Sequence, residues 1–329
     1  MKLSVVIPVY NREKIIAETV HSILRQDAGL VDYEIILVDD GSQDASASVC
    51  RQLERQYPQV TFFTQENAGP GAARNNGLAH AQGDYVWFVD SDDWIAPDSF
   101  SILKPLLDNT LDAVVFSAAD VLEDGQRRRW HYEHLQGRQL TGLQYIDQCI
   151  RVGFLSFTFR FSVSIPLTVF RRQYLVQQHL LMKDTMYHED FEFMPRAFFS
   201  MQRLTVLNDM LYLVRHTPGS IVRSANVKKA FDYLTAARCL YDFVTNNPSS
   251  CNRKLYVAIA VAVSNSLFEV ERSCQAHHAD YLHELRHHAD IYAAALWRTR
   301  HAKFMLMALL LHLSPSLLVS IYNKILIKL

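Results

Sequence analysis

The first half of the chain alternates apolar runs of strand length with stretches of helical periodicity. Leu3–Tyr10 (LSVVIPVY) is such a run, and Arg12–Gln26 places its apolar residues on one helical face. The runs YEIILVDD, VTFFTQ and DYVWFVD follow at intervals of about 25 to 30 residues, with helical stretches between them. This alternation is typical of βαβ units and predicts an α/β fold with a mostly parallel central sheet flanked by helices.

Beyond residue 100 the pattern is less regular. Leu111–His134 predicts a strand with a hairpin-like excursion, Met186–Phe199 predicts a helix with acids at its start, and Leu204–Arg215 predicts a pair of strands. From residue 226 the periodicity is helical, and HHADYLHELRHHADIYAAALWRTRHAK predicts one His/Arg-rich helix. We therefore expect an α/β domain over residues 1–225 and a C-terminal helical region over residues 226–329.

The helical region ends in an apolar segment. Phe304–Asn323 contains no Asp, Glu, Lys or Arg, and Lys303 and Lys324 flank it. The segment is long enough to span a bilayer, but His312 and Ser314–Ser316 lie at its centre. Two short helices lying in the membrane interface fit this pattern better, giving peripheral membrane contact. Packing onto the catalytic domain or a partner chain, and true spanning, are the alternatives.

Composition argues against several classes of protein. The net charge of the 329 residues is −1, which provides no general field for nucleic acid. The five cysteines are scattered and include no C-x-x-C pair, which argues against a disulfide framework and a structural zinc site. The first residues, MKLSVVIPVY, read as a strand and not as a secretory leader, so we expect the protein to stay in the cytoplasm.

Polar residues collect where the predicted strands end. Tyr10–Asn11, Asp39–Asp40 and Asp90–Asp92 each follow an apolar run. In open α/β sheets the ligand binds outside the carboxyl ends of the strands, so three strands direct polar residues toward one place. Asp90 and Asp92 are two residues apart and could hold a hard divalent cation, which in turn could bind a diphosphate. An acidic helix N-cap is the structural alternative.

Four motifs occur in a characteristic order: VVIPVYN, ILVDDGSQD, NAGPGAARNNGL and GDYVWFVDSDDW. With them the chain resembles a family 2 glycosyltransferase of the bacterial surface-polysaccharide type, over roughly residues 2–223. The resemblance weakens between about residues 100 and 180. It implies the GT-A fold, which is Rossmann-like, here with a C-terminal helical extension.

The resemblance assigns the donor nucleotide to the first strand ends. Pro8, Tyr10 and Glu13 resemble the start of the family's nucleoside site. Asp40, with Asp39 beside it, matches the acid that accepts a hydrogen bond from the uracil ring.

The next two motifs complete the implied donor site. Asn67 and Arg74 match residues that close over the nucleotide. Asp90, Ser91 and Asp92 match the D-x-D motif, in which Asp92 is the expected metal ligand and Asp90 contacts the ribose or the sugar.

The resemblance also assigns the later motifs. HEDFEF matches the family's E-D motif, so Asp190 is the expected general base, which takes the proton of the attacking hydroxyl. For the acids of this motif, interaction with a helix N-terminus is the structural alternative. In LVRHTPGSIVRS, His216 is an expected metal ligand, although a lone histidine is as often structural, and Ser220 and Arg223 are expected to close over the phosphates.

The implied activity is an inverting transfer of a sugar from a UDP-sugar to a hydroxyl of a glycan or polyprenyl-linked acceptor, with Mn²⁺ or Mg²⁺ as cofactor. We expect it to act in polysaccharide or lipopolysaccharide assembly at the inner face of the cell membrane. A homo-oligomer is an open option. The alternatives are a nucleotidyltransferase on a related fold and a membrane partner that binds nucleotide-sugar without turnover.

Overall fold

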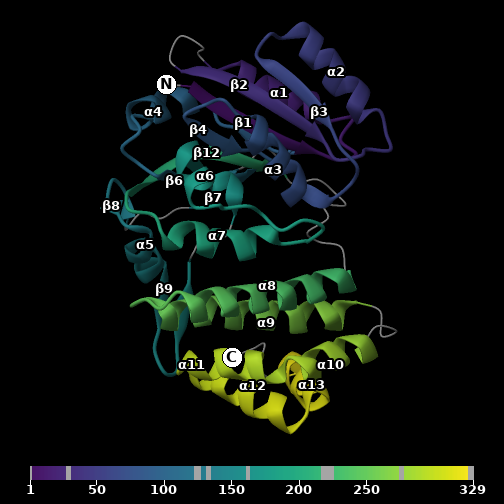
Figure 1. Ribbon diagram of the computed structural model, residues 1–329, viewed down its shortest axis with the longest axis vertical. Helices are drawn as coiled ribbons and strands as arrows, with labels where there is room; N and C mark the ends of the chain where they lie inside the picture. The colour runs from purple at the N-terminus through teal and green to yellow at the C-terminus, as the bar shows by residue number, and fades with distance from the viewer. Residues whose placement is uncertain are drawn as a thin grey trace. The chain divides into compact units, whose positions relative to one another are not determined.

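The computed structural model describes residues 2–26, 31–121, 127–130, 135–160, 164–215, 226–273 and 278–324. The chain forms two compact units (Figure 1). The sheet unit comprises Met1–Gly142, Ser164–Thr185 and Ser200–Ser220, and the helical unit comprises Leu143–Val163, Met186–Phe199 and Ile221–Leu329. The helical unit thus takes two segments from the first 225 residues as well as everything after residue 220, and the division at residue 225 stays a prediction.

The sheet unit is built around one large sheet. Its elements are β1 (Lys2–Val9), α1 (Ile16–Leu24), β2 (Asp32–Asp39), α2 (Ser46–Gln56), β3 (Val60–Thr64), α3 (Gly69–His80), β4 (Tyr85–Phe88), β5 (Trp94–Ile95), α4 (Ser99–Leu103), β6 (Ala113–Val121), β7 (Arg127–Trp130), β8 (Gln139–Leu140), β11 (Thr168–Arg171), α6 (Arg172–Gln177) and β12 (Leu204–Arg215). Short 3₁₀ turns lie at Lys104–Leu106 and Ile165–Leu167.

The strand order in this sheet is β3-β2-β1-β4-β11-β6-β12-β5, with β7 paired to β6 and β8 to β12. The strands β3, β2, β1 and β4 are mutually parallel, as are β6 and β12, whereas β11 runs antiparallel between the two groups. The predicted α/β fold with a mostly parallel sheet and flanking helices is confirmed. Since β2, β1 and β4 are neighbours, their carboxyl ends lie side by side at one edge.

Helices cover both faces of the parallel strands, which explains why these strands are apolar at every position. Val5 and Ile7 of β1 belong to the same core cluster as residues of α1, α2 and α4. On the opposite face α3 approaches β1 closely, because a Cβ added at Gly77 would lie 2.2 Å from Val6 Cγ1. Close approach of this helix brings its first turn to the end of β2.

The helical unit contains a bundle and one hairpin. Its elements are α5 (Gly142–Cys149), β9 (Ile150–Val152), β10 (Phe157–Phe159), α7 (Glu189–Phe199), α8 (Val227–Asn246), α9 (Asn252–Arg272), α10 (His278–His287), α11 (Ala289–Arg298), α12 (Ala302–Leu313) and α13 (Pro315–Lys324). The strands β9 and β10 form a separate antiparallel pair. Helix α9 is buried along most of its length, with α8 and α11 packed against it.

Three sequence expectations can be compared with these elements. The apolar tail does break into two helices, α12 and α13, on either side of Ser314. The expected strand pair near Leu204–Arg215 is wrong: the segment is one long strand, whose register shifts absorb its irregular pattern. The expected single His-rich helix is also wrong, because it is interrupted at His288 between α10 and α11.

Among the described residues, none of the helices combines the length and the apolar character that crossing a membrane requires. Helices α12 and α13 have 12 and 10 residues, whereas a spanning helix needs about 20.

Candidate functional site

The carboxyl ends of β1, β2 and β4 bring the predicted donor residues together in the sheet unit. Tyr10 directly follows β1 and is 37% exposed, Asp39 and Asp40 close β2, and Asp90 to Asp92 form a turn after β4. Pro8 lies inside β1, buried and paired with Val38 of β2. It is therefore a core residue of the strand, and Tyr10 is the first side chain of this strand that reaches the edge.

The Asp40 carboxylate is hydrogen-bonded to the start of α3. Its Oδ1 accepts hydrogen bonds from the Gln65 amide (2.8 Å) and from the Ala68 N–H (2.9 Å), and its Oδ2 accepts one from the Gly69 N–H (2.8 Å). The Asn67 side chain donates to the Asp40 carbonyl at 2.9 Å. The carboxylate thus accepts from backbone N–H groups at the first turn of the helix, where negative charge is stabilised.

Asp39 differs from its neighbour. It is only 2% exposed, and its Oδ2 accepts from the Ser42 N–H at 3.2 Å. Its Oδ1 is buried and has no hydrogen-bond partner in the described part of the chain. A buried acceptor without a partner carries a desolvation cost, and a ligand N–H would remove that cost. Of the two adjacent acids, Asp39 has the acceptor that a ligand can use.

The loops after β1 and β2 are joined by side-chain hydrogen bonds. The Asn11 Oδ1 accepts from the Gln43 N–H at 2.8 Å, and the Asn11 N–H donates to the Ser42 hydroxyl at 2.9 Å. The Glu13 carboxylate accepts from the Ala45 N–H at 2.9 Å, at the start of α2. Glu13 therefore holds the two loops in place, and its predicted contact with the nucleoside stays a prediction.

Two arginines face the acidic turn after β4. Arg74, buried in α3, donates to Asp90 at 2.6 Å. Arg12, in the loop after β1, donates to Asp92 at 3.2 Å and to the Tyr10 and Asn11 carbonyls. Each carboxylate of the D-x-D pair thus faces one guanidinium group.

The third acid, Asp93, points into the protein. Its Oδ2 accepts from the Tyr212 hydroxyl at 2.8 Å, and its Oδ1 accepts from the Arg215 N–H at 2.8 Å. The same Tyr212 oxygen accepts from the Asp90 N–H at 3.1 Å, and the Thr19 hydroxyl donates to the Ser91 carbonyl at 3.0 Å. Tyr212 is fully buried in β12, so it links the acidic turn to the neighbouring part of the sheet.

Burial and repulsion between carboxylates raise the pKa values of two acids in this turn. Burial, and then the charge of Asp90, raise the pKa of Asp92 despite Arg12. Burial, and then Asp90 and Asp92, raise the pKa of Asp93 well above its usual range. A divalent cation would offset this repulsion, and carboxylate oxygens are the ligands that Mg²⁺ and Mn²⁺ prefer. The donor set therefore fits a cation with Asp92 as ligand.

No cluster of three or more metal-ligating side chains exists among the described residues. A cation bound by Asp92 would need other oxygen ligands, such as those of a diphosphate. The predicted ligand His216, and with it Ser220 and Arg223, lie outside the described residues.

The predicted base lies in the helical unit. Asp190 is in the first turn of α7, and its Oδ1 accepts from the Phe191 N–H at 2.8 Å. His188, just before the helix, has a left-handed backbone with φ of 59° and stacks on Tyr233 at 4.3 Å between ring centroids. Glu189 is buried, so Asp190 is the more accessible of the two acids in the motif.

Sequence reasoning missed three residues of the site. Arg12 follows the polar strand end directly, and its position in YNREK was the available signal. Tyr212 and Arg215 had no signal, because nothing in the sequence shows that the middle and end of β12 lie beside the turn after β4. Arg215 also pairs with Glu18 at 2.7 Å and lies over the Trp94 ring at 3.8 Å.

Comparisons with known proteins match this chain to glycosyltransferases. The family model described as glycosyl transferase family 2 matches residues 4–165. The chain is 31% identical over 225 residues to the uncharacterized glycosyltransferase EpsJ of Bacillus subtilis, covering 67% of this chain and 62% of EpsJ. The chain thus spans less than two thirds of that relative.

Two solved structures share the fold. The crystal structure of Staphylococcus aureus TarS 1-349 in complex with UDP-GlcNAc superposes with a TM-score of 0.70 at 19% identity, covering 98% of this chain and 92% of that one. The mannosyltransferase PcManGT from Pyrobaculum calidifontis, in complex with GDP-Man and Mn²⁺, has a TM-score of 0.53 at 17% identity, covering 98% and 87%. The predicted GT-A fold is confirmed by these neighbours.

Proposed function

The chain belongs to glycosyl transferase family 2, and from this premise we propose that it transfers a sugar from a UDP-sugar to a hydroxyl group, with inversion at the anomeric carbon. The observation that carries the proposal is the convergence of three strand ends on one edge. There Asp39 Oδ1, which has no hydrogen-bond partner within the described ranges, lies at the same sheet edge as the acidic turn after β4. A nucleoside and a diphosphate can be bound there together.

We assign recognition of the base to Asp39 in place of Asp40. The uracil ring N–H is a donor and needs an acceptor that is not already used. Three hydrogen bonds occupy the Asp40 carboxylate, whereas Asp39 Oδ1 has none with the residues that the structure describes. The exposed Tyr10 ring at the neighbouring strand end offers an aromatic surface against which the base can stack.

The diphosphate is proposed to lie between the two arginines and the acidic turn. Arg12 and Arg74 already face this turn, and a guanidinium group binds phosphate oxygens in a bidentate geometry. A Mn²⁺ or Mg²⁺ ion held by Asp92 would supply Lewis-acid stabilisation to the departing diphosphate. Asp90 remains the proposed contact of the ribose or sugar.

Asp190 is the proposed general base. The Asp190 carboxylate lies in the first turn of α7, where the helix dipole favours negative charge. It takes the proton of the acceptor hydroxyl as that oxygen attacks the anomeric carbon and the nucleoside diphosphate leaves. A single displacement of this kind inverts the configuration and requires no enzyme nucleophile.

The acceptor side is proposed from charge and hydropathy. The acceptor is a glycan or a polyprenyl-linked glycan used in surface-polysaccharide assembly, and the C-terminal tail contacts the inner face of the membrane peripherally. Helices α12 and α13 are short and apolar, and their lysines lie at the outer ends, Lys303 in the first turn of α12 and Lys324 at the end of α13. TarS and PcManGT support only the use of nucleotide-sugars as donors, because each was solved with one bound.

Calorimetric titration of UDP tests the site. We expect UDP to bind in Mn²⁺ and the affinity to fall at least about tenfold in Asp92→Ala, because the cation loses its carboxylate ligand. In EDTA the wild type and the variant should bind equally weakly.

The matched control is Asp32→Ala, which removes an exposed carboxylate at the opposite end of β2 and should leave UDP affinity unchanged. Equal UDP affinity in Asp92→Ala and wild type, with Mn²⁺ present, would exclude the cation role of Asp92.

A further inference from the structure

Most of the large hydrophobic side chains that the described residues expose lie in the helical unit. Seven of the eleven large hydrophobic side chains that the described residues expose belong to its hairpin and its last three helices. We call this set the apolar face. Its members are Phe154, Leu155, Trp297, Leu306, Leu309, Leu313 and Leu317.

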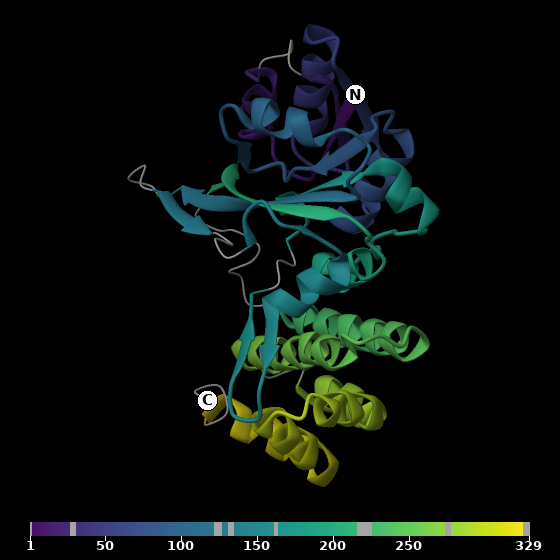
Figure 2. The same cartoon turned by 90° about the vertical axis from the view of Figure 1, so that its left-hand side faces the viewer.

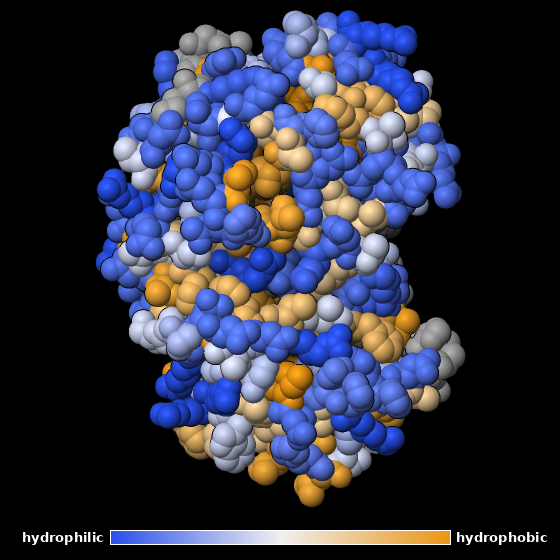
Figure 3. All heavy atoms as spheres, in the orientation of Figure 1, coloured by the Kyte–Doolittle hydropathy of each residue, from blue (hydrophilic) through white to orange (hydrophobic). Residues whose placement is uncertain are grey.

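Helix α12 is apolar on both sides. Phe304, Met307 and Leu311 are buried against the bundle, with the spacing of one helical face. Leu306, Leu309 and Leu313 repeat that spacing on the outside, and Leu313 is 76% exposed. Figure 3 shows hydrophobic residues at the surface in the lowest part of the view, where the last helices lie in Figure 1. A helix at the water-facing surface of a globular unit normally has a polar outer face, so this side of α12 is suited to another environment.

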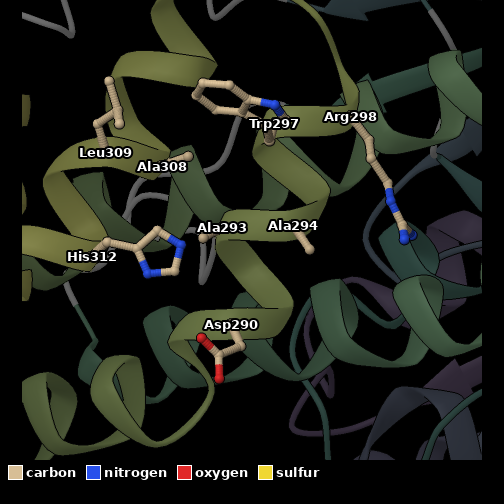
Figure 4. A pocket seen from close by; sticks show the side chains of 8 residues that line it. All are labelled: Asp290, Ala293, Ala294, Trp297, Arg298, Ala308, Leu309 and His312. Carbon is tan, nitrogen blue, oxygen red and sulfur yellow. The ribbon is translucent and has the colours of Figure 1, made fainter.

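A groove of about 510 Å³ lies next to this ridge, between α11 and α12. Ala293, Ala294 and Ala308 form its floor, and Trp297 and Leu309 stand at its side (Figure 4). Asp290, Arg298 and His312 complete the lining. The groove is thus lined mainly by apolar side chains; in Figure 4 Asp290 and Arg298 lie at its edges, and the His312 ring lies beside Ala293.

The hairpin adds a second element to the same surface. Its turn is closed by the Gly153 N–H donating to the Ser156 carbonyl at 2.8 Å, and its tip carries Phe154 and Leu155, which is 81% exposed. The Phe154 carbonyl accepts from the Ala302 N–H at 2.7 Å, which places the tip at the first turn of α12 (Figure 2). Nearly 150 residues of sequence separate these segments, so no local pattern predicts their contact.

The Phe157 ring anchors the hairpin from behind. Its centroid lies 5.2 Å from that of His301 and 5.1 Å from that of Phe304. The outward direction of Phe154 and Leu155 therefore follows from a fixed, packed base.

The Asp, Glu, Lys and Arg residues in the tail of the chain are all basic ones. Residues 297–329 contain no Asp or Glu, although the whole chain has a net charge of −1. Their basic residues are Arg298, Arg300, Lys303, Lys324 and Lys328. Basic residues beside an exposed apolar surface favour an anionic lipid headgroup layer, and tryptophan is the residue enriched at that depth.

We propose that the apolar face inserts into the headgroup layer of an anionic phospholipid bilayer, and that the β9–β10 tip and α12 form two separate insertion elements of one surface. This deepens the peripheral contact included in the proposed function and rests on it. The groove offers apolar surface to a fatty acyl chain beside Trp297.

Vesicle co-sedimentation of the full chain tests the proposal. We expect binding to phosphatidylcholine vesicles that contain one quarter phosphatidylglycerol, and at least about tenfold weaker binding to phosphatidylcholine alone. The double variant Leu309→Glu/Leu313→Glu should lower binding to anionic vesicles about tenfold or more, and Phe154→Ser/Leu155→Ser should lower it severalfold.

The matched control is Val176→Glu/Leu181→Glu, which places the same two charges on exposed apolar residues (53% and 56%) in the sheet unit. It should bind vesicles as the wild type does. All variants should keep the wild-type affinity for UDP, so that loss of membrane binding is separated from failure of the donor site. Equal vesicle binding by the wild type and the Leu309→Glu/Leu313→Glu variant would overturn the proposal.

Tryptophan emission gives a second readout. Trp297 is the one tryptophan of the helical unit, so vesicles should shift the wild-type emission to shorter wavelength and leave Trp297→Phe unchanged. An identical shift in both proteins would count against insertion at this face. A dimer in solution that Leu309→Glu/Leu313→Glu dissociates, without vesicle binding by the wild type, would assign the face to a second copy of the chain and overturn the lipid proposal.

Discussion

The sheet unit and the helical unit differ in where their polar and apolar side chains lie. In the sheet unit the strands are buried on both faces, so polar side chains are concentrated at the strand ends, where Arg12, Arg74 and the acids meet. In the helical unit the polar groups are dispersed, and apolar side chains such as Leu309 and Leu313 occupy the outside. The first arrangement is suited to a charged small ligand and the second to an extended apolar surface.

The carboxylates of the two units also differ in their surroundings. In the sheet unit Asp90, Asp92 and Asp93 repel one another, and the pKa values of Asp92 and Asp93 are raised. In the helical unit Asp190 shares the first turn of α7 with Glu189 and Glu192, where the helix dipole favours negative charge and Arg196 pairs with Glu192. The crowded acids of the sheet unit are suited to holding a cation, whereas Asp190 is the proposed base.

The largest expected effect tests this division of roles. In Asp190→Asn the amide can no longer accept a proton, so sugar transfer should fall by about 10³-fold, within the range typical for loss of a general base. UDP affinity should stay within about twofold of wild type, because the donor contacts lie at the sheet edge. Transfer is measured as release of UDP with a UDP-sugar and acceptor.

Asp280→Asn is the matched control for this change. Asp280 is also in the first turn of a helix of the same unit, α10, so both substitutions remove a similar favourable charge–dipole interaction of about 0.3–1 kcal/mol. If the two variants lose transfer equally, the loss reflects helix stability, and Asp190 is not the base.

A second comparison concerns buried tyrosines, one in each unit. Tyr212→Phe removes the hydroxyl that joins the Asp90 N–H to the Asp93 carboxylate, so the acidic turn loses a support. We expect the affinity for UDP in Mn²⁺ to fall about tenfold, equivalent to about 1.4 kcal/mol. Calorimetric titration measures this effect.

Tyr281→Phe gives the corresponding change in the helical unit. The Tyr281 and Ser266 hydroxyls are 2.7 Å apart in its core, so this variant should lose stability without losing UDP affinity. A fall in UDP affinity of the same size in both variants would show that general destabilisation, and not the position of the acidic turn, is responsible.

The sequence predicts most of the sheet unit, for a physical reason. Strands buried on both faces must be apolar throughout, so VVIPVYN and DYVWFVDSDDW mark both the strand and the point where it ends. The partner of each end group is less predictable. The sequence could not show that Gln65, Ala68 and Gly69 all donate to the Asp40 carboxylate, since those bonds depend on how α3 meets β2.

Prediction is weaker in the helical unit because helical periodicity does not say which neighbour covers a face. The tail break at Ser314 was predictable from SPS, but the contact between Phe154 and Ala302 was not, since it joins distant segments. The register shifts in β12 and the interruption at His288 likewise arise from tertiary packing that overrides local pattern.

The smallest expected effect concerns His188, beside the acids of α7. Burial, and then the charge of Lys229, lower the pKa of His188 from 6.5 to about 4. Below pH 6.5 the unfolded chain therefore binds a proton that the folded chain does not, so the free energy of unfolding falls as the pH drops from 6.5 toward 4. His188→Phe keeps a ring against Tyr233 and removes the titrating group.

Between pH 7 and pH 5.5 the wild type should lose about 1 kcal/mol more stability than His188→Phe, as measured by urea unfolding at both pH values. His21→Phe in the sheet unit is the matched control, since His21 also contacts a tyrosine, Tyr57, at 5.9 Å between ring centroids. Wild-type pH dependence in His188→Phe would mean that the acid sensitivity arises elsewhere. Wild-type pH dependence in His21→Phe alone would place it at the start of α7, in the helical unit that carries the proposed base.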